Sequence, residues 1–268
     1  EGLITALKSP APNVRAIGFE GLKAKGRAAL APVAELLKDE NPYIQARAIY
    51  VLYNLGISGP RFAGYPAEQP TAQRMIAAYR AMRRAGLDFT ASAMRLAAHP
   101  DPAVRREVAL SMRNESIETS KEILVMLAQG YDGKDRSYLE ALGTGATGKE
   151  KEIYQAVKAA MATEDSRTWS PSFAGIAWRL HPAGAVEDFV IRAKNETLPR
   201  DLRKQALDTI AFIDTKVAAD AMLTFAMLDT PLKADAIWWL MNRANNNWKK
   251  HDVMTALKER GIYDPSKV

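Results

Sequence analysis

The sequence contains no cysteine among its 268 residues. Without cysteine the chain cannot form a disulfide framework, a thiolate metal site, a thiol nucleophile or a covalent attachment for c-type haem. Histidine is also scarce, because only His99, His181 and His251 are present, and they lie far apart without the i, i+4 spacing of a helical metal site. We therefore predict no metal and no cofactor, and we expect His99 and His181, each followed by proline, to interact with helix C-termini.

Other features that commonly indicate function are missing as well. No run of about 18 apolar residues is present, so we predict no membrane-spanning segment. There is no G-x-x-x-x-G-K-[ST] phosphate loop, no G-x-S-x-G nucleophile turn and no G-x-G-x-x-G after a strand. These absences predict a chain without catalytic residues, which is not itself an enzyme. The chain also begins at Glu1 without an initiator methionine or a leader, and we expect it to be a segment of a larger protein.

The composition is that of a folded domain with a modest positive charge. The chain is 47% hydrophobic and 25% charged, which is typical of a globular core with a solvated surface. Its 37 lysines and arginines exceed its 31 acidic residues by six. This surplus permits acidic partners but does not require nucleic acid.

A repeat of about 30 residues organises the chain. Residues 13–16 are echoed by residues 43–46 and 103–106, each time directly after a proline. Pro12 and Pro42 are 30 residues apart, and Pro102 follows 60 residues later. Such a period is the signature of stacked supersecondary units, none of which can bury its apolar face alone.

Each repeat is predicted to be a pair of helices. In residues 41–56, Asn41 can cap a helix that starts at Pro42 and stops at Gly56, and apolar residues recur between them at helical spacing. No segment shows the period-two alternation of a strand. We predict helices at 2–8, 13–24, 28–38, 42–55, 71–85, 88–98, 101–113, 117–129, 135–146, 149–162, 170–180, 183–194, 199–213, 215–228, 231–244 and 248–260.

These helices predict an all-α fold, an α-solenoid or superhelix of about seven HEAT-like hairpins. We expect one repeat domain over residues 1–268, interrupted by a loop insertion at 57–70. The insertion is rich in glycine and proline and contains Phe62 and Tyr65. Loops that interrupt repeats often make functional contacts, so Phe62 and Tyr65 are candidate interaction residues, although they can equally pack the loop against the surface.

Basic residues recur near the starts of the second helices of the pairs, including Arg15, Arg105, Arg136 and Arg203. We expect them mainly to support the repeat, but Arg105, its neighbour Arg106, and Arg136 with nearby Tyr131 are retained as candidate interaction residues.

The polar segment 129–136 lacks the alternating acidic ligands and the terminal glutamate of a calcium loop. We predict instead a tight turn in which Asp135 caps the next helix. The segment 143–145, Gly-Thr-Gly, is interpreted as a helix C-cap.

All five tryptophans lie in the last hundred residues. On the helix predicted at 231–244, Trp239 shares a face with Leu232 and Ala236, whereas Trp238 is turned by about 100° from it. Trp238 is then either covered by the last helix, which contains Trp248, or exposed to a partner. We expect coverage, but we retain Trp238 and Trp248 as candidate interaction residues because large aromatic side chains often anchor interfaces.

The chain resembles HEAT-like repeat proteins, in its paired-helix rhythm and its Pro-x-Val-Arg turns; residues 99–113, HPDPAVRREVALSMR, are representative. More specifically, YDGKDRSYLEALGTGA, AIWWLMNRANNNWK and LKERGIYDPSKV are similar to the helical-repeat region of large bacterial multidomain proteins called PVC-type haem-binding or membrane-bound dehydrogenase proteins. Ser137 stands where that family often has an aromatic residue.

In that family the repeats commonly lie between a catalytic domain and a small cytochrome c domain with a C-x-x-C-H motif. The present chain contains no such motif, so the resemblance implies no haem-binding residue here. It implies a spacer or docking module in an exported, for example periplasmic, protein, because c-type haem is attached outside the cytoplasm.

Three functions are compatible with the sequence. The leading hypothesis is a non-catalytic scaffold that binds flanking domains of its own polypeptide or another protein. The alternative is a nucleic-acid-binding protein, similar to HEAT-like DNA glycosylases, that uses a basic concave face. It is disfavoured because basic and aromatic residues are poorly interleaved in the first 160 residues. A lyase similar to HEAT-like bilin lyases rests on fold analogy alone.

Overall fold

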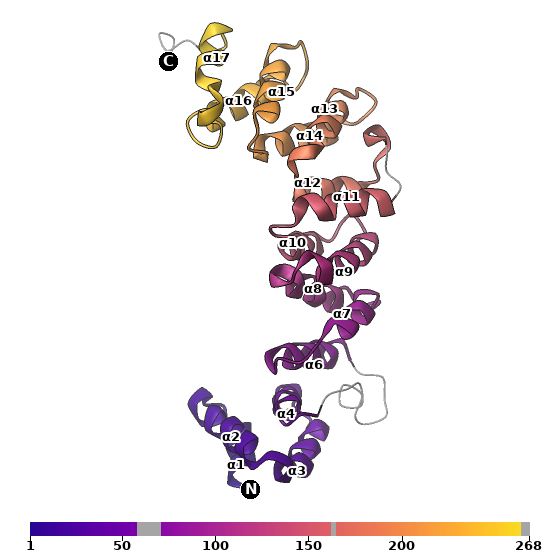
Figure 1. Cartoon of the computed structure of the whole chain (residues 1–268), viewed down its shortest axis with the longest axis vertical. Helices are drawn as coiled ribbons and strands as arrows, with labels where there is room; N and C mark the ends of the chain where they lie inside the picture. The colour runs from indigo at the N-terminus through magenta and orange to yellow at the C-terminus, as the bar shows by residue number, and fades with distance from the viewer. Residues whose placement is uncertain (58–70, 162–164, 264–268) are drawn as a thin grey trace. The chain divides into compact units, whose positions relative to one another are not determined.

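The computed structural model describes residues 1–57, 71–161 and 165–263 and confirms the all-α prediction (Figure 1). No strand occurs in these described ranges. The α-helices are α1 (Gly2–Lys8), α2 (Pro12–Lys25), α3 (Leu30–Glu35), α4 (Pro42–Asn54), α6 (Ala72–Arg84), α7 (Thr90–Ala97), α8 (Pro102–Ser111), α9 (Ile117–Gln129), α10 (Arg136–Gly145), α11 (Glu150–Ala160), α12 (Pro171–Leu180), α13 (Val186–Lys194), α14 (Arg200–Phe212), α15 (Lys216–Met227), α16 (Lys233–Arg243) and α17 (Val253–Glu259).

Polar caps define many of the helix starts. The side chain of Asn41 accepts a hydrogen bond from the backbone N–H of Tyr43, and Asp135 accepts one from Tyr138 at the start of α10, as predicted for both. Ser170 caps α12 in the same way. These contacts satisfy N–H groups that have no partner within the first helical turn.

Some predicted helices are interrupted. The range 28–38 is divided into a 3₁₀ turn (Gly26–Ala29), α3 and a second 3₁₀ turn (Leu36–Lys38). Pro32 explains the first division, because it lacks an N–H and is tolerated only in the first turn of a helix. The range 248–260 is divided at Asp252, which has a left-handed backbone (φ 54°) between a 3₁₀ turn and α17.

The chain forms two compact units, Glu1–Val108 and Ala109–Val268, with the division inside α8. In unit 1, α1 packs on α2, α4 packs on α6, and both α2 and α3 contact α4. The core between them is largely aliphatic, with Leu7, Val33, Ile49 and Leu52 almost fully buried.

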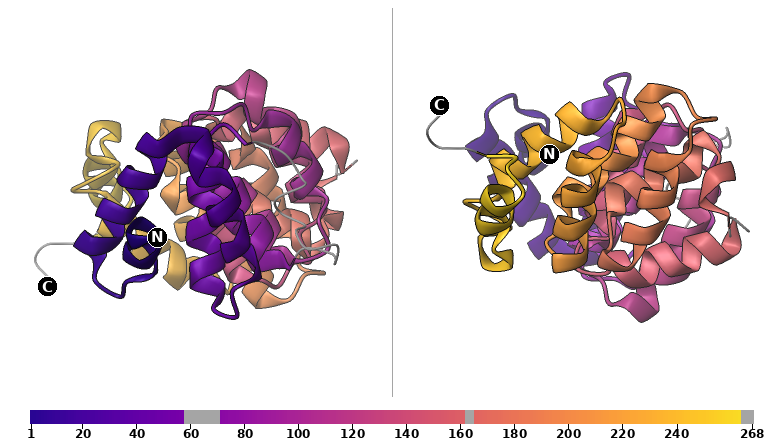
Figure 2. Two further views of the ribbon diagram at one scale, coloured as in Figure 1. Left: turned by 90° about the horizontal axis from the view of Figure 1, so that it is seen from below. Right: turned by 90° about the horizontal axis from the view of Figure 1, so that it is seen from above.

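Unit 2 contains stacked helical pairs. Each of α9, α10, α12, α13 and α14 contacts the helix two places further along the chain, and α13, α14, α15 and α16 contact one another in succession. The helices therefore form two layers, which are seen from one end in Figure 2. This neighbour-to-neighbour packing is that of stacked helical hairpins. The superhelix and the single repeat domain over 1–268 stay predictions.

A repeated hydrogen bond holds the turn between paired helices. Arg15, Gln45 and Arg105 occupy equivalent positions, and the side chain of each donates to the backbone carbonyl six residues earlier, on Ser9, Asp39 and His99 respectively. Arg15 and Arg105 also donate to the next carbonyl. The expected structural role of these basic positions is therefore confirmed for Arg15 and Arg105.

The expected interaction of histidine with a helix C-terminus is clearest at His181. This residue ends α12 with a left-handed backbone (φ 31°), and its Nδ1 lies 3.2 Å from the carbonyl oxygen of Trp178. His99 follows the end of α7, and its Nδ1 accepts a hydrogen bond from the N–H of Asp101. Both histidines thus organise helix ends.

Gly143 and Gly145 lie at the end of a helix, as expected, but the C-cap residue itself is Ala146. Both lie inside α10, and the left-handed residue that follows it is Gly148 (φ 76°). A Cβ atom on Gly145 would lie 2.3 Å from the carbonyl oxygen of Ala109. Glycine is needed here for close helix packing, which a sequence pattern cannot distinguish from a cap.

Candidate functional site

The structure separates the predicted interaction residues. Phe62 and Tyr65 lie outside the described residues. Arg105 and Arg106 lie on α8 in unit 1, where both are half-buried. The prediction for Trp248 as a contact residue is wrong, because its side chain is completely buried and its Nε1 donates to the carbonyl of Ile213 at 3.0 Å.

The expected coverage of Trp238 is also wrong. Its side chain is 57% exposed on α16. Its ring contacts Trp239 edge-on, with the ring centroids 4.7 Å apart. The last helix instead uses Val253 and Leu257 in the core, so it does not shield Trp238.

Tyr131 and Arg136 come together at a pocket of unit 2. The pocket has a volume of about 270 Å³ and is bounded by the turn before α10, the segment before α12, α12 itself, the end of α13 and the first half of α14. Tyr131 is buried, with only 8% exposed, and stacks on Tyr138 at a centroid distance of 5.8 Å. Its predicted role as a surface contact is therefore replaced by a place in the pocket wall.

Aromatic rings form much of the wall. Trp169 and Trp178 line the pocket together with Tyr131. Trp169 packs edge-on against Phe173 and Phe189, with centroid distances of 4.8 and 5.8 Å. These contacts fix the orientation of the Trp169 ring, so the aromatic wall is preformed.

The polar part of the pocket is cationic. Lys134, Arg136 and Arg192 line it, and among the described residues no carboxylate does. The first residues of α10 and α12, Arg136 and Pro171, also lie at the pocket, so the partly positive N-terminal ends of both helices lie there. The site therefore has a positive electrostatic character.

Arg192 is the least usual of these residues. It is 97% buried, since only 3% of it is exposed. Its guanidinium donates to the carbonyl of Ser166 at 2.7 Å and lies 5.2 Å from the centre of the Trp169 ring. No carboxylate of the described ranges forms an ion pair with it, and burial lowers its pKa. A buried guanidinium with five N–H donors and one carbonyl acceptor keeps donor capacity for a ligand.

The rim of the pocket is held by an ion-pair network. Glu140 binds the guanidinium groups of Arg136 and Arg179, the latter at 2.6 Å. Arg136 also lies over the ring of Trp178, 4.4 Å from its centre. Burial by itself would raise the pKa of Glu140, but the hydrogen bond and charge of Arg179, together with those of Arg136, lower it below its usual value.

We expect the network to make unit 2 less stable in acid. Because the pKa of Glu140 is lower in the folded state, its stabilisation is present above the unfolded pKa of about 4.3 and is lost as the pH falls through the folded value. The Glu140→Gln variant should be about 0.2–1 kcal/mol less stable than wild type at pH 7, and this difference should shrink towards pH 3. Urea unfolding at both pH values measures it; a difference that does not change with pH would contradict the ion-pair assignment.

A second aromatic group lies on α14 and α16. Phe212, which is 50% exposed, contacts Trp239 with a centroid distance of 5.4 Å, and Trp239 contacts Trp238. Arg243 lies 4.9 Å from the centre of the Phe212 ring and 5.1 Å from that of Trp239. We call Phe212, Trp238, Trp239 and Arg243 the aromatic patch.

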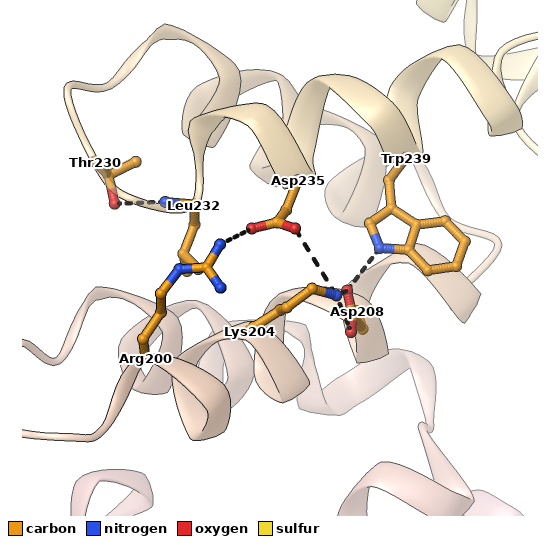
Figure 3. A network of polar contacts seen from close by, with 7 residues as sticks. All are labelled: Arg200, Lys204, Asp208, Thr230, Leu232, Asp235 and Trp239. Carbon is orange, nitrogen blue, oxygen red and sulfur yellow. Dashed lines mark hydrogen bonds and ion pairs between the residues drawn. The ribbon is translucent and has the colours of Figure 1, made fainter.

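Beside the patch, the carboxylates of Asp208 and Asp235 lie near the same lysine (Figure 3). Lys204 lies between them, 2.7 Å from Asp208 and 3.9 Å from Asp235. Asp208 also accepts a hydrogen bond from Nε1 of Trp239 at 2.7 Å, and Asp235 binds Arg200 at 2.8 Å. Each carboxylate is therefore engaged in joining α14 to α16.

Within the described ranges, no group of three or more histidine or acidic side chains is placed to hold a metal ion. The same ranges contain no helix that is both long and apolar enough to cross a membrane. No model of a known protein family matches the chain, and no curated protein does so either.

Arg192, Trp169 and Trp178 are not predicted as site residues by the sequence. The only signal was the concentration of tryptophan in the second half of the chain. Arg192 lies in the last turn of α13, where a basic residue ordinarily faces solvent at a helix C-terminus. Its burial depends on the packing of the 165–169 segment over α13, which no local pattern indicates.

Proposed function

We propose that the chain is a non-catalytic interaction module that positions other domains. In this proposal it binds flanking domains of its own polypeptide, a catalytic domain and a cytochrome c domain in an exported dehydrogenase-like protein, or a partner protein. The aromatic patch is the observation that supports it best. Tryptophan and arginine are among the residues most enriched in interface hot spots. Trp238 is exposed although α17 comes next after α16 in the sequence.

The chemistry of the described side chains agrees with binding. The paired carboxylates of Figure 3 are bound to cations and to an indole N–H. The proposal therefore assigns this part of unit 2 to recognition.

The proposal is tested by calorimetric titration of the chain with the separately expressed remainder of its parent polypeptide. We expect association, and we expect Trp238→Ala to weaken it by roughly 30-fold, the size of an interface hot spot. Tyr43→Ala is the matched control, because Tyr43 is a comparably exposed aromatic residue (74%) in unit 1. An absence of association, or equal binding by wild type and Trp238→Ala, would reject the proposal.

One observation favours the alternative, nucleic-acid binding. A groove of about 570 Å³ in unit 1 contains Arg15, Arg47 and Arg84 beside Tyr43 and Tyr50. Basic and aromatic residues are therefore better interleaved in this half than the sequence indicated. However, Arg15 and Arg47 donate to backbone carbonyls, which reduces their capacity for phosphate.

The alternative is separated from the protein-binding proposal by gel-shift titration with single- and double-stranded DNA. Phosphate contacts would give an affinity that falls steeply between 50 and 200 mM salt. We expect no such shift. A salt-dependent shift that Arg84→Gln weakens would support the alternative.

A further inference from the structure

The strongest unassigned feature of unit 2 is the pocket that Arg192 lines. Arg192 is 3% exposed as a residue, and its guanidinium donates to one neutral carbonyl and lies over the Trp169 ring, but it forms no ion pair with a carboxylate of the described residues. A buried charge is costly unless it is paired and hydrogen-bonded. The site is therefore incomplete in a way that an anion would complete.

The other lining groups define the kind of anion. Lys134 adds positive charge, the charge of Arg136 is shared with Glu140, and Tyr131, Trp169 and Trp178 supply aromatic surface. A volume of about 270 Å³ is at the small end for ligand pockets. An inorganic anion would leave the aromatic wall unused.

We propose that this pocket binds a carboxylate attached to a small aromatic or apolar group, with Arg192 as the carboxylate ligand and Tyr131, Trp169 and Trp178 around the apolar part. A guanidinium presents two parallel N–H groups that match a carboxylate. The ligand is either a free organic acid or the C-terminal residue of a peptide. This proposal does not depend on the aromatic patch. If it fails, the proposed function as an interaction module is not affected.

Two probes and their uncharged counterparts distinguish the sources. Phenylacetate is compared with 2-phenylethanol, and a tripeptide ending in phenylalanine is compared as free acid and as amide, by calorimetric titration of the full chain. We expect each acid that binds to do so at least tenfold more tightly than its uncharged counterpart, because a hydrogen bond to a charged group contributes about that factor or more. Binding of phenylacetate alone identifies a free acid, and binding of the peptide acid identifies a chain terminus.

Variants test the pocket without removing the buried arginine. Gln205 lines the pocket from α14, and Gln205→Glu is isosteric but places a negative charge beside the ligand. We expect it to weaken binding of the acid at least tenfold. The matched control is Gln73→Glu, the same change at an exposed position of unit 1, which should leave the affinity unchanged.

Arg192→Gln should abolish binding, and circular dichroism shows whether that variant still folds. If it does not fold, Gln205→Glu decides the matter. The proposal is overturned if neither acid binds, if an acid and its uncharged counterpart bind equally, or if Gln205→Glu binds the acid as well as wild type.

Discussion

Replacing Trp248 by alanine should remove about 3–5 kcal/mol from the free energy of unfolding of unit 2, the usual cost of truncating a buried tryptophan. The side chain is completely buried, and its Nε1 donates to the carbonyl of Ile213, which the substitution would leave without this partner. With about 2–4 °C per kcal/mol for a unit of this size, the melting temperature should fall by roughly 6–20 °C. Urea and thermal unfolding monitored by circular dichroism measure both quantities.

Trp238→Ala is the matched control for this prediction. It makes the same change ten residues earlier, but at a side chain that is 57% exposed and contacts Trp239 through one ring edge. Its cost should stay near 1 kcal/mol, the value of an aromatic pair. Equal losses for the two variants would show that Trp248 does not anchor the C-terminal segment to the core.

Gly145→Ala is expected to destabilise unit 2 by about 1–3 kcal/mol or more, although alanine is ordinarily the better helix residue. The added Cβ would lie 2.3 Å from the carbonyl oxygen of Ala109 and 3.0 Å from a methyl carbon of Leu124. Because one of these atoms belongs to the backbone, α10 must move away from its neighbour. Denaturant titration measures the loss.

The same substitution in α12 should have the opposite sign. A Cβ on Gly175 would meet Tyr131 at 3.4 Å and Leu139 at 3.7 Å, which are ordinary contacts. Gly175→Ala should therefore raise the free energy of unfolding by up to about 1 kcal/mol through helix propensity. A loss of stability for Gly175→Ala equal to that for Gly145→Ala would mean that packing distance does not explain the difference.

The helices could be predicted well from sequence because their signals are local. Asn41 before Pro42, and Asp135 before α10, mark starts that the structure confirms by hydrogen bonds. Helical spacing predicts an apolar stripe at Ile44, Ala48, Val51 and Leu55, of which Ala48 and Val51 are fully buried. The close packing at Gly145 could not be predicted. Its backbone conformation is an ordinary helical one, and the need for glycine comes from a carbonyl oxygen 36 residues away.

The pocket could be predicted only in part. Tyr131 and Arg136 were identified from one polar turn, and they do lie together. The sequence predicts that the last helix covers Trp238 and keeps both Trp238 and Trp248 as candidate contacts, because helical phase gives the direction of a side chain but not what covers it. Arg192 was missed since its surroundings come from segments distant in sequence, so its burial is a property of the packed unit.

The hydrogen bond from Arg15, Gln45 or Arg105 to the carbonyl six residues earlier lies wholly within one short stretch of chain. A hairpin that is copied or deleted as a block keeps both ends of this bond, so no compensating change is required elsewhere. The same local bond forms with guanidinium or amide donors, which leaves the position tolerant of exchange between arginine and glutamine. Arrays of this kind can thus gain or lose hairpins during evolution while the turn between each pair of helices keeps its hydrogen bond.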